Sequence, residues 1–323
     1  MKNNILIVPG GSGMAVSAIK SLKQDKTMHI VSVDTDRLAA GLYLSHKGYI
    51  VPSFEDKKFI LAIENIVKKE KINLIIPSLD TILLNFSKLK LFFKEKGADV
   101  LVSEPETIEI TRDKWKTYNK LKDIISFPKS FIEKEEINIK YPIFIKPREG
   151  SGSQNAYKIN SKEELDFYYG RIKNPIIQEY LSGKEYTADC LADSSNKLIL
   201  TICRERIETK AGISSKGQIV KNKEIEDIAV KISENLKFYG PFFFQIKEDE
   251  NGVPKLTEIN ARISGTMSFS SFSGPNIHIL AAKMSRGEKI KKSKVKYGMY
   301  VTRYLEDIYL TEKKIIKDIK NEL

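Results

Sequence analysis

Cysteine, histidine and long apolar runs are scarce in this chain of 323 residues, and each scarcity removes a class of chemistry. Cys190 and Cys203 are too few for a disulfide framework, so we expect reduced thiols in the core. Three scattered histidines lack the spacing of a zinc site. No run approaches the ~20 apolar residues of a membrane span, and the first residues do not follow the pattern of a signal peptide. We therefore expect a cytoplasmic protein without a membrane partner.

Charged residues, in contrast, are abundant. The chain carries 54 Lys and Arg against 42 Asp and Glu, which gives a net charge of +12. Such a balance suits a nucleic acid or an anionic substrate. Because most lysines are interleaved with glutamates along predicted helices, they indicate solvated helix faces, and we expect no nucleic-acid partner. A non-catalytic basic binding module is the alternative, and it would bind nucleic acid with a steep salt dependence.

Apolar strands alternate with helices through the first third of the chain. The predicted strands lie near residues 4–8, 29–33, 48–51, 74–76 and 99–102, and the predicted helices include 57–69 and 81–95. This order predicts a parallel sheet covered on both faces, in a Rossmann-like domain that spans residues 1–110. The fold class is therefore α/β.

A glycine turn follows the first strand. Gly11 and Gly13 precede a helix, and Asp34 ends the next strand, as in a dinucleotide-binding βαβ unit. An NAD-dependent oxidoreductase is therefore one hypothesis. Val16 stands where that motif needs a small residue, so a turn that serves folding alone is at least as good an interpretation.

Two lysines mark the next part of the chain. Lys114 lies in a lysine-rich helix with Thr111 as its predicted cap, and Lys146 ends an apolar strand. The loop after Lys146 contains Gly150, Ser151, Gly152 and Ser153. Backbone N–H groups of such a loop can surround phosphate oxygens while an ammonium neutralises them. An ordinary Gly/Ser turn between strands is the simpler alternative.

A further predicted strand ends in Glu179, Tyr180 and Leu181, and Glu185 follows. The backbone of such a strand end can meet an adenine edge, and a nearby acid can accept ribose hydroxyls. A turn with an exposed glutamate is the simpler interpretation.

A polar excursion from Arg204 to Gly217 follows two predicted strands, and its composition predicts a mobile segment. Its basic residues Arg204, Arg206 and Lys210 are candidates for contacting an anionic substrate.

The most informative stretch is 240–262. Asn251-Gly252 is a strong hairpin signal, and a turn centred there places Gln245 opposite Glu258. The period of two puts Glu258, Asn260 and Arg262 on one face, together with Leu256. Hard oxygen ligands beside a fixed positive charge suit Mg²⁺ and a phosphate. A solvated hairpin with a salt bridge is the simpler alternative.

In this order and spacing, the features resemble the ATP-grasp superfamily, in its carbamoyl-phosphate-synthase-like and biotin-carboxylase-like branch, and look most like a short stand-alone ATP-grasp ligase. The likeness covers essentially the whole chain. It implies an α+β, two-part ATP-grasp domain after the Rossmann-like domain. The small lid subdomain would span residues 111–182, and the large one residues 183–323, ending in a strand and an amphipathic tail.

The resemblance also implies roles for the residues singled out above. Lys114, Lys146 and the loop 150–153 would contact ATP phosphates. Residues 179–181 would contact the adenine, and Glu185 the ribose. Gln245, Glu258 and Asn260 look like the Mg²⁺ ligands. Arg262 would act with Lys146 in catalysis, near the transferred phosphate.

The implied reaction joins a small-molecule carboxylate to an amine or another nucleophile through an acyl phosphate, with release of ADP and phosphate. A kinase or a carboxylating enzyme would use the same phosphate machinery. One or two Mg²⁺ ions are expected, with Mn²⁺ as a substitute, and a homodimer is one expectation. The chain departs from many relatives at Asp80, which is followed by Thr81 and Ile82 and lacks the usual acid two positions later.

Overall fold

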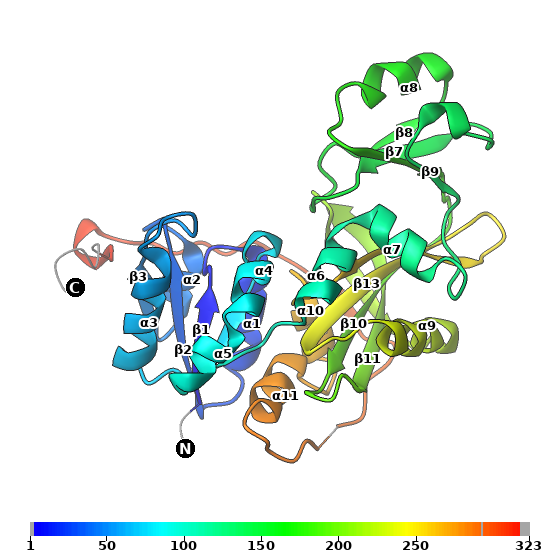
Figure 1. Ribbon diagram of the computed structural model, residues 1–323. Coiled ribbons are helices and arrows are strands. Elements are labelled where there is room, and N and C mark those ends of the chain that lie inside the picture. Colours follow the sequence, from blue (N-terminus) through cyan, green and yellow to red (C-terminus); the bar gives the residue numbers. More distant parts are fainter. Residues whose placement is uncertain (1–2, 292, 317–323) are drawn as a thin grey trace.

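Three β-sheets organise the computed structural model of the chain, which describes residues 3–291 and 293–316. Figure 1 shows one sheet in an N-terminal domain, a larger sheet beside it, and a small lobe that stands above the larger sheet. The predicted α/β class with a Rossmann-like N-terminal domain is confirmed.

The N-terminal sheet is parallel throughout, with the strand order β3-β2-β1-β4-β5. Its strands are β1 (Asn3–Val8), β2 (Met28–Asp34), β3 (Lys47–Ile50), β4 (Leu74–Pro77) and β5 (Asp99–Val100). Continuous apolar runs form these strands because helices cover both faces of the sheet. Their carboxyl ends, including Pro77 of β4, point toward the loops that precede the next helices.

Helices cover the two faces of this sheet in different ways. The helices are α1 (Gly13–Leu22), α2 (Ala40–Leu44), α3 (Phe59–Lys69), α4 (Asp80–Lys88) and α5 (Lys90–Glu95). Leu6 and Val31 share a buried cluster with α3 and α4, whereas Ile5 and Ile30 share another with α1. The helix expected over residues 81–95 is broken at Leu89, which ends α4 and precedes α5.

The larger sheet is antiparallel and has the order β14-β13-β10-β11-β12-β15. Its strands are β10 (Glu185–Ala192), β11 (Leu198–Lys210), β12 (Ile213–Val220), β13 (Gly240–Glu248), β14 (Pro254–Asn260) and β15 (Tyr300–Thr302). Helix α9 (Lys223–Asn235) packs on one face. On the other face, α10 (Met267–Ser271) and α11 (Ile277–Met284) lie between this sheet and α1, so one apolar cluster joins the two parts of the molecule.

The small lobe contains a four-stranded sheet with the order β6-β9-β7-β8. Its strands are β6 (Ser130–Phe131), β7 (Ile143–Pro147), β8 (Tyr157–Ile159) and β9 (Pro175–Glu179), and helix α8 (Lys162–Tyr169) packs on them. Its core is separate and small, with Ile143, Ile145 and Leu165 among its buried residues. A lobe with its own core can move as a unit relative to the larger sheet.

Two helices connect the N-terminal domain to the lobe, α6 (Pro105–Arg112) and α7 (Lys114–Leu121). Thr111 was the predicted cap of the second, but it lies inside α6, and its hydroxyl donates to the carbonyl of Thr107. Asp113 is the cap instead, because its carboxylate accepts the backbone N–H groups of Trp115 and Lys116.

The β13–β14 hairpin has the predicted pairing at its centre. Gln245 lies opposite Glu258, and Phe243 lies opposite Asn260. A β-bulge follows Gln245, so the extra residue Thr257 shifts the register toward the turn. For this reason the prediction that Leu256 shares a face with Glu258 is wrong, and Leu256 is buried in the core.

The predicted mobile excursion from Arg204 to Gly217 is an ordered hairpin. Strands β11 and β12 pair along its length and turn at Ala211 and Gly212, where both residues have positive φ. The polar composition led to the wrong expectation because buried and more exposed residues alternate along β12, as they do in an antiparallel hairpin with one solvated face.

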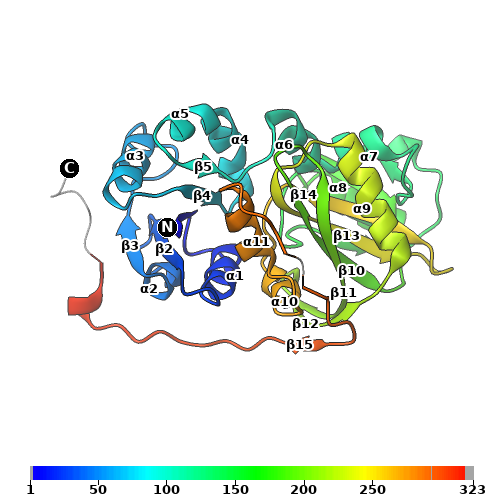
Figure 2. The same ribbon diagram turned by 90° about the horizontal axis from the view of Figure 1, so that it is seen from below.

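After β15 the chain leaves the larger sheet and returns to the N-terminal domain, as Figure 2 shows. Residues 303–316, here called the strap, end where Ile316 packs with Ala39, Leu42 and Ile50. Of the predicted amphipathic tail, Ile319 and Leu323 lie outside the described residues. Among the helices that are described, none has the length and apolar character needed to cross a bilayer.

Candidate active site

A cavity of about 540 Å³ lies between the small lobe and the larger sheet. Strands β7 and β9 form its lobe side, and β13 and β14 form its opposite side. Eleven of the predicted site residues line it: Lys114, Lys146, Gly150, Ser151, Ser153, Glu179, Tyr180, Leu181, Glu185, Gln245 and Glu258. Gly152, Asn260 and Arg262 lie nearby but outside this lining. The three basic residues expected at the substrate, Arg204, Arg206 and Lys210, are not part of the lining either.

Lys146 is the cation most affected by the protein around it. Its Nζ donates to the carbonyl of Thr257 at 3.3 Å. Loss of water and, to a lesser degree, the neighbouring ammonium of Lys114 lower the pKa of Lys146 to about 7. Glu258 and Glu185 oppose this shift only partly, so the site lacks negative charge. An anion in the cavity would restore the proton to Lys146.

Lys114 is tied to the glycine loop. Its Nζ donates to the carbonyls of Arg148, at 3.4 Å, and Gly150, at 3.2 Å. Arg148 in turn binds both carboxylate oxygens of Asp113, at 3.1 and 2.5 Å. The sequence did not identify Arg148 and Asp113 as supports, although Asp113 directly precedes Lys114 and Arg148 lies between Lys146 and Gly150. They hold the start of α7 against the start of the loop.

The predicted adenine segment begins at a glutamate that is already engaged. Lys255 donates to both carboxylate oxygens of Glu179, at 2.8 and 2.9 Å, and the backbone N–H of Lys129 donates to one of them. Residues 179–181 line the cavity, and the backbone N–H of Glu179 donates to the carbonyl of Lys129 at 2.9 Å. Lys158 lies 4.5 Å from the centre of the Tyr180 ring, which fixes that side chain outside the strand.

Glu185, the predicted ribose contact, forms an ion pair with Arg206, with 2.7 Å between Arg206 Nε and the carboxylate. Arg206 also donates to the carbonyl of Gly212 at 2.9 Å and to the hydroxyl of Thr187. Its side chain is almost fully buried, and desolvation lowers its pKa. Arg206 therefore holds Glu185 and the β11–β12 turn in place.

Gln245, Glu258 and Asn260 gather on one face of the hairpin. Asn260 Nδ2 donates to a carboxylate oxygen of Glu258 at 2.8 Å. In the described chain, Glu258 forms no ion pair within 4.0 Å, so its charge is available for a ligand. Residues 3–291 and 293–316 contain no cluster of three His, Cys, Asp or Glu side chains that could hold a metal alone. A cation here would need further oxygen ligands from a bound molecule.

Arg262 is buried and faces the N-terminal domain. Its Nε and Nη2 donate to the two carboxylate oxygens of Asp80, at 2.8 and 2.6 Å. Nη2 also lies 3.4 Å from Asn260 Oδ1, which connects the arginine to the hairpin face. Sequence reasoning noted Asp80 only for the acid missing after it, because nothing in the sequence indicates contact with a residue 182 positions later.

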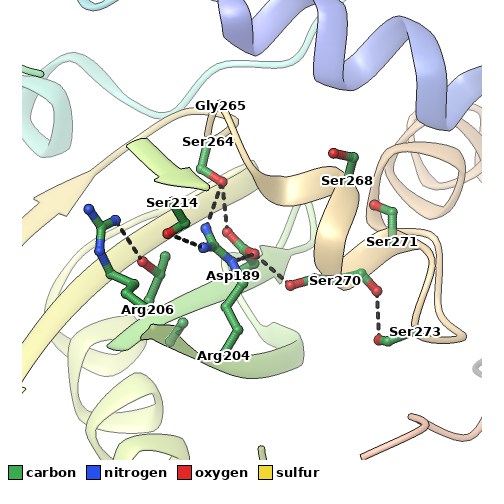
Figure 3. A network of polar contacts seen from close by, with 12 residues as sticks. Asp189, Arg204, Arg206, Ser214, Ser264, Gly265, Ser268, Ser270, Ser271 and Ser273 are labelled. Atoms are coloured by element: carbon green, nitrogen blue, oxygen red, sulfur yellow. Dashed lines mark hydrogen bonds and ion pairs between the residues drawn. The ribbon is translucent and has the colours of Figure 1, made fainter. Parts of the chain in front are cut away.

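The other basic residues expected at a substrate lie elsewhere. Arg204 is 1% exposed and binds Asp189 at 2.8 Å, and Ser214 and Ser264 complete the network drawn in Figure 3. Burial of this pair inside the sheet makes Arg204 structural. Lys210 is 80% exposed at the hairpin tip, 3.7 Å from Glu208. The structure does not bring these two residues to the cavity lining.

The glycine turn after β1 is closed by the protein itself. Gly11 donates its N–H to Asp34 Oδ2 at 2.7 Å, so the acid on which the dinucleotide-binding hypothesis depends is already bound. Helix α2 packs so tightly on the turn that a Cβ at Gly41 would lie 2.0 Å from the carbonyl oxygen of Gly10. These contacts favour the folding interpretation of Gly11 and Gly13 over the dinucleotide site.

Comparison with protein families finds two matches along the chain. Residues 5–101 match a family described as "PylC-like, N-terminal domain", and residues 171–307 match "ATP-grasp in the biosynthetic pathway with Ter operon". The resemblance to the ATP-grasp superfamily is thereby confirmed.

Curated relatives extend this likeness. The carbamoyl phosphate synthase large chain of Clostridium beijerinckii is 30% identical over 320 residues, which cover 89% of this chain but 28% of that protein. A D-alanine–D-alanine ligase of Petrotoga mobilis is 27% identical over 179 residues, or 54% of each chain. The matches thus span about a quarter to a half of these relatives.

Solved structures share the fold. An N5-carboxyaminoimidazole synthetase from Staphylococcus aureus, complexed with ADP, has a TM-score of 0.75 at 20% identity and aligns over 94% of this chain and 83% of its own. A biotin carboxylase from Campylobacter jejuni also has a TM-score of 0.75, at 15% identity, over 93% and 74% of the two chains.

Proposed function

We propose that this ATP-grasp chain is an ATP- and Mg²⁺-dependent ligase that joins a small-molecule carboxylate to an amine or another nucleophile. One observation carries the proposal. Two lysine ammonium groups and the unpaired carboxylate of Glu258 face the same cavity between two sheets. The lysines lack an anion and Glu258 lacks a cation, and a metal–nucleotide complex supplies both.

The nucleotide would fill the cavity along its length. Residues 179–181 would receive the adenine through their backbone, and Glu185, held by Arg206, would accept the ribose hydroxyls. Lys114, Lys146 and the loop 150–153 would surround the phosphates. The fit is supported by Lys146, because a buried ammonium with a lowered pKa gains a strong partner from phosphate oxygens.

Gln245, Glu258 and Asn260 would hold Mg²⁺ through hard oxygen ligands. One carboxylate and two amides fit an ion that keeps water and takes substrate phosphates as its remaining ligands. Bound there, the metal would neutralise phosphate charge. Mn²⁺ accepts the same oxygen ligands and is expected to replace it.

The chain contributes positions and charge to the chemistry. Phosphoryl transfer to a carboxylate brings anions together, so neutralisation and alignment decide the rate more than a protein nucleophile does. Lys146 and Arg262 would lie on either side of the transferred group, and an acyl phosphate formed there would then react with the nucleophile. The loop 150–153 would exclude water from this intermediate, since its Gly152 touches the β11–β12 turn.

A kinase or a carboxylating enzyme would use the same residues and differ only in the second substrate. Product analysis separates them, because a ligase releases ADP and phosphate only when an acid and a nucleophile are both present.

An NAD-dependent oxidoreductase would instead require Asp34 to leave Gly11, and Asp34→Arg would abolish binding of the nicotinamide cofactor. A homodimer, a cytoplasmic location and the absence of a nucleic-acid partner are also part of the proposal.

Removing the charge of Glu258 tests the proposal. We expect Glu258→Gln, and separately Asn260→Ala, to reduce Mg·ATP turnover by at least about 100-fold, because the metal loses a ligand beside the transferred phosphate. ADP release is measured across a panel of carboxylates and amines. Glu109→Gln makes the same change on the exposed face of α6 and should leave turnover unchanged. Full turnover in both site variants would refute the assignment.

A further inference from the structure

The guanidinium of Arg262 has almost no donor left for a ligand. Nε and Nη2 bind Asp80, Nη1 donates to the carbonyl of Ile263 at 3.0 Å, and Nη2 also faces Asn260. Only 4% of the side chain is exposed, and it lies over the Phe243 ring at 5.3 Å. The Nε–Nη2 edge is the one that binds a planar two-oxygen anion through two parallel hydrogen bonds, and Asp80 occupies it.

The position of Asp80 keeps the free energy of separating it from Arg262 low on the Asp80 side. It is the first residue of α4, where the helix dipole favours a carboxylate with or without an arginine. Its side chain is 31% exposed, so water can solvate it once the pair separates. Arg262, in contrast, is buried and requires an anion in the same place.

Arg262 lies just outside the cavity lining, with its Nε–Nη2 edge toward the N-terminal domain. The lining of the cavity includes Gln245 and Glu258, while the guanidinium of Arg262 faces α4 of the N-terminal domain. A molecule that binds the Nε–Nη2 edge of Arg262 through two oxygens must therefore take the place that Asp80 now occupies.

We infer that Asp80 is an internal competitor for Arg262, and that the carboxylate of the acid substrate binds Arg262 by displacing it. The inference rests on the proposed function, because it takes Arg262 as the residue that meets the reacting anion. Substrate binding then removes an ion pair between the N-terminal domain and the hairpin that carries Gln245, Glu258 and Asn260. The apolar cluster around α1, α10 and α11 still joins the two parts of the molecule when this ion pair is broken.

The test uses acetate as a minimal carboxylate and needs no turnover. Acetate replaces chloride at constant ionic strength, and its apparent dissociation constant is obtained from the shift of the thermal unfolding midpoint of the full chain. We expect Asp80→Asn to bind acetate about threefold to tenfold more tightly than wild type, as loss of a partly exposed competitor implies. Asp80→Ser, which keeps a good helix-start residue, should behave alike.

Two controls isolate the effect. Glu306→Gln removes another acid that pairs with the N-terminal domain, through Lys20 at 3.6 Å, and should leave acetate affinity unchanged. Asp80→Asn combined with Arg262→Gln should lose the gain. Unchanged or weaker acetate binding in both Asp80 variants would mean that Asp80 only orients Arg262 and does not compete with a ligand. Tighter binding of inorganic phosphate without tighter binding of acetate would contradict the proposal that Arg262 binds a carboxylate. Because turnover of Glu258→Gln tests the enzyme activity separately, failure of one idea does not imply failure of the other.

Discussion

At the scale of single residues, Lys146 shows how strongly burial changes the chemistry of a residue in the cavity. Burial and the charge of Lys114 lower its pKa to about 7, so near neutral pH only part of the free protein carries the proton. Phosphate oxygens would stabilise the ammonium and raise this pKa again. Nucleotide binding is therefore linked to proton uptake.

This linkage is measurable. At about pH 8 the free lysine is mostly neutral, so Mg·ATP binding should take up close to one proton, and above pH 7 the affinity should fall by up to about tenfold per pH unit. Below the lowered pKa the lysine is already protonated, and uptake should disappear. Calorimetric titrations in buffers with different ionisation enthalpies give the proton count. Lys146→Arg keeps its charge at either pH, so persistence of the uptake in that variant would assign the proton to another group.

Individual residues also show what can be inferred from the sequence. The turn signal Asn251-Gly252 located the hairpin, but the strands beside the turn pair one residue away from the predicted register, and the bulge at Thr257 brings Gln245 opposite Glu258 as predicted. The burial of Arg204 and its ion pair with Asp189 could not be predicted from the sequence. Asp189 lies on the adjacent strand, and the packing of the whole sheet decides which residues are buried. The same holds for Arg262, whose partner comes from another domain.

At the scale of elements, the β11–β12 hairpin takes the place of the mobile segment that its composition predicted. Its turn reaches the glycine loop of the lobe, because a Cβ at Gly212 would lie 2.7 Å from the backbone of Gly152. Arg206 donates a hydrogen bond to the carbonyl of Gly212. The hairpin is thus an ordered support against which the glycine loop of the lobe rests, and composition alone could not identify it.

Replacing Gly212 by alanine should disturb that support. The added methyl group would push the loop away, and we expect KM for Mg·ATP to rise by about threefold to tenfold, together with a loss of roughly 1 kcal/mol of stability from the positive φ. Steady-state kinetics and thermal unfolding separate the two effects.

Gly252→Ala is the matched control for this substitution. Its φ of +80° gives the same strain, but no atom lies within 4 Å of the added Cβ. The control should lose stability without a change in KM. Equal KM values for the two variants would show that the loop does not depend on the hairpin.

At the scale of the whole molecule, the strap of residues 303–316 holds the N-terminal domain against the larger sheet. Arg303 donates to the carbonyl of Gly265 at 2.5 Å at one end, and Ile316 packs beside Tyr43 at the other. A Cβ at Gly48 would lie 2.8 Å from Ile316 Cδ1, so Ile316 packs closely against the N-terminal domain. Much of the strap between these ends is exposed, including Leu305 and Tyr309.

Ile316→Ser should release the strap. Loss of a half-buried apolar side chain costs about 1 kcal/mol, and the freed segment should be cut faster by trypsin after Arg303, Lys313 and Lys314. Ile308→Ser makes the same change at a more exposed position of the strap and should not alter the rate. Equal cleavage rates in both variants would show that Ile316 does not anchor the strap.

The return of the strap has a consequence for synthesis of the protein. The N-terminal sheet leaves the ribosome first, but the residue that fills the seat between Ala39, Leu42 and Ile50 is made some 266 positions after Ile50. Until Ile316 emerges from the ribosome, the newly made N-terminal domain exposes the apolar patch formed by Ala39, Leu42 and Ile50. The larger sheet must therefore fold while this patch is still exposed. The patch is therefore a place where a nascent chain can bind chaperones or a wrong partner, and it closes only when Ile316 has been synthesised.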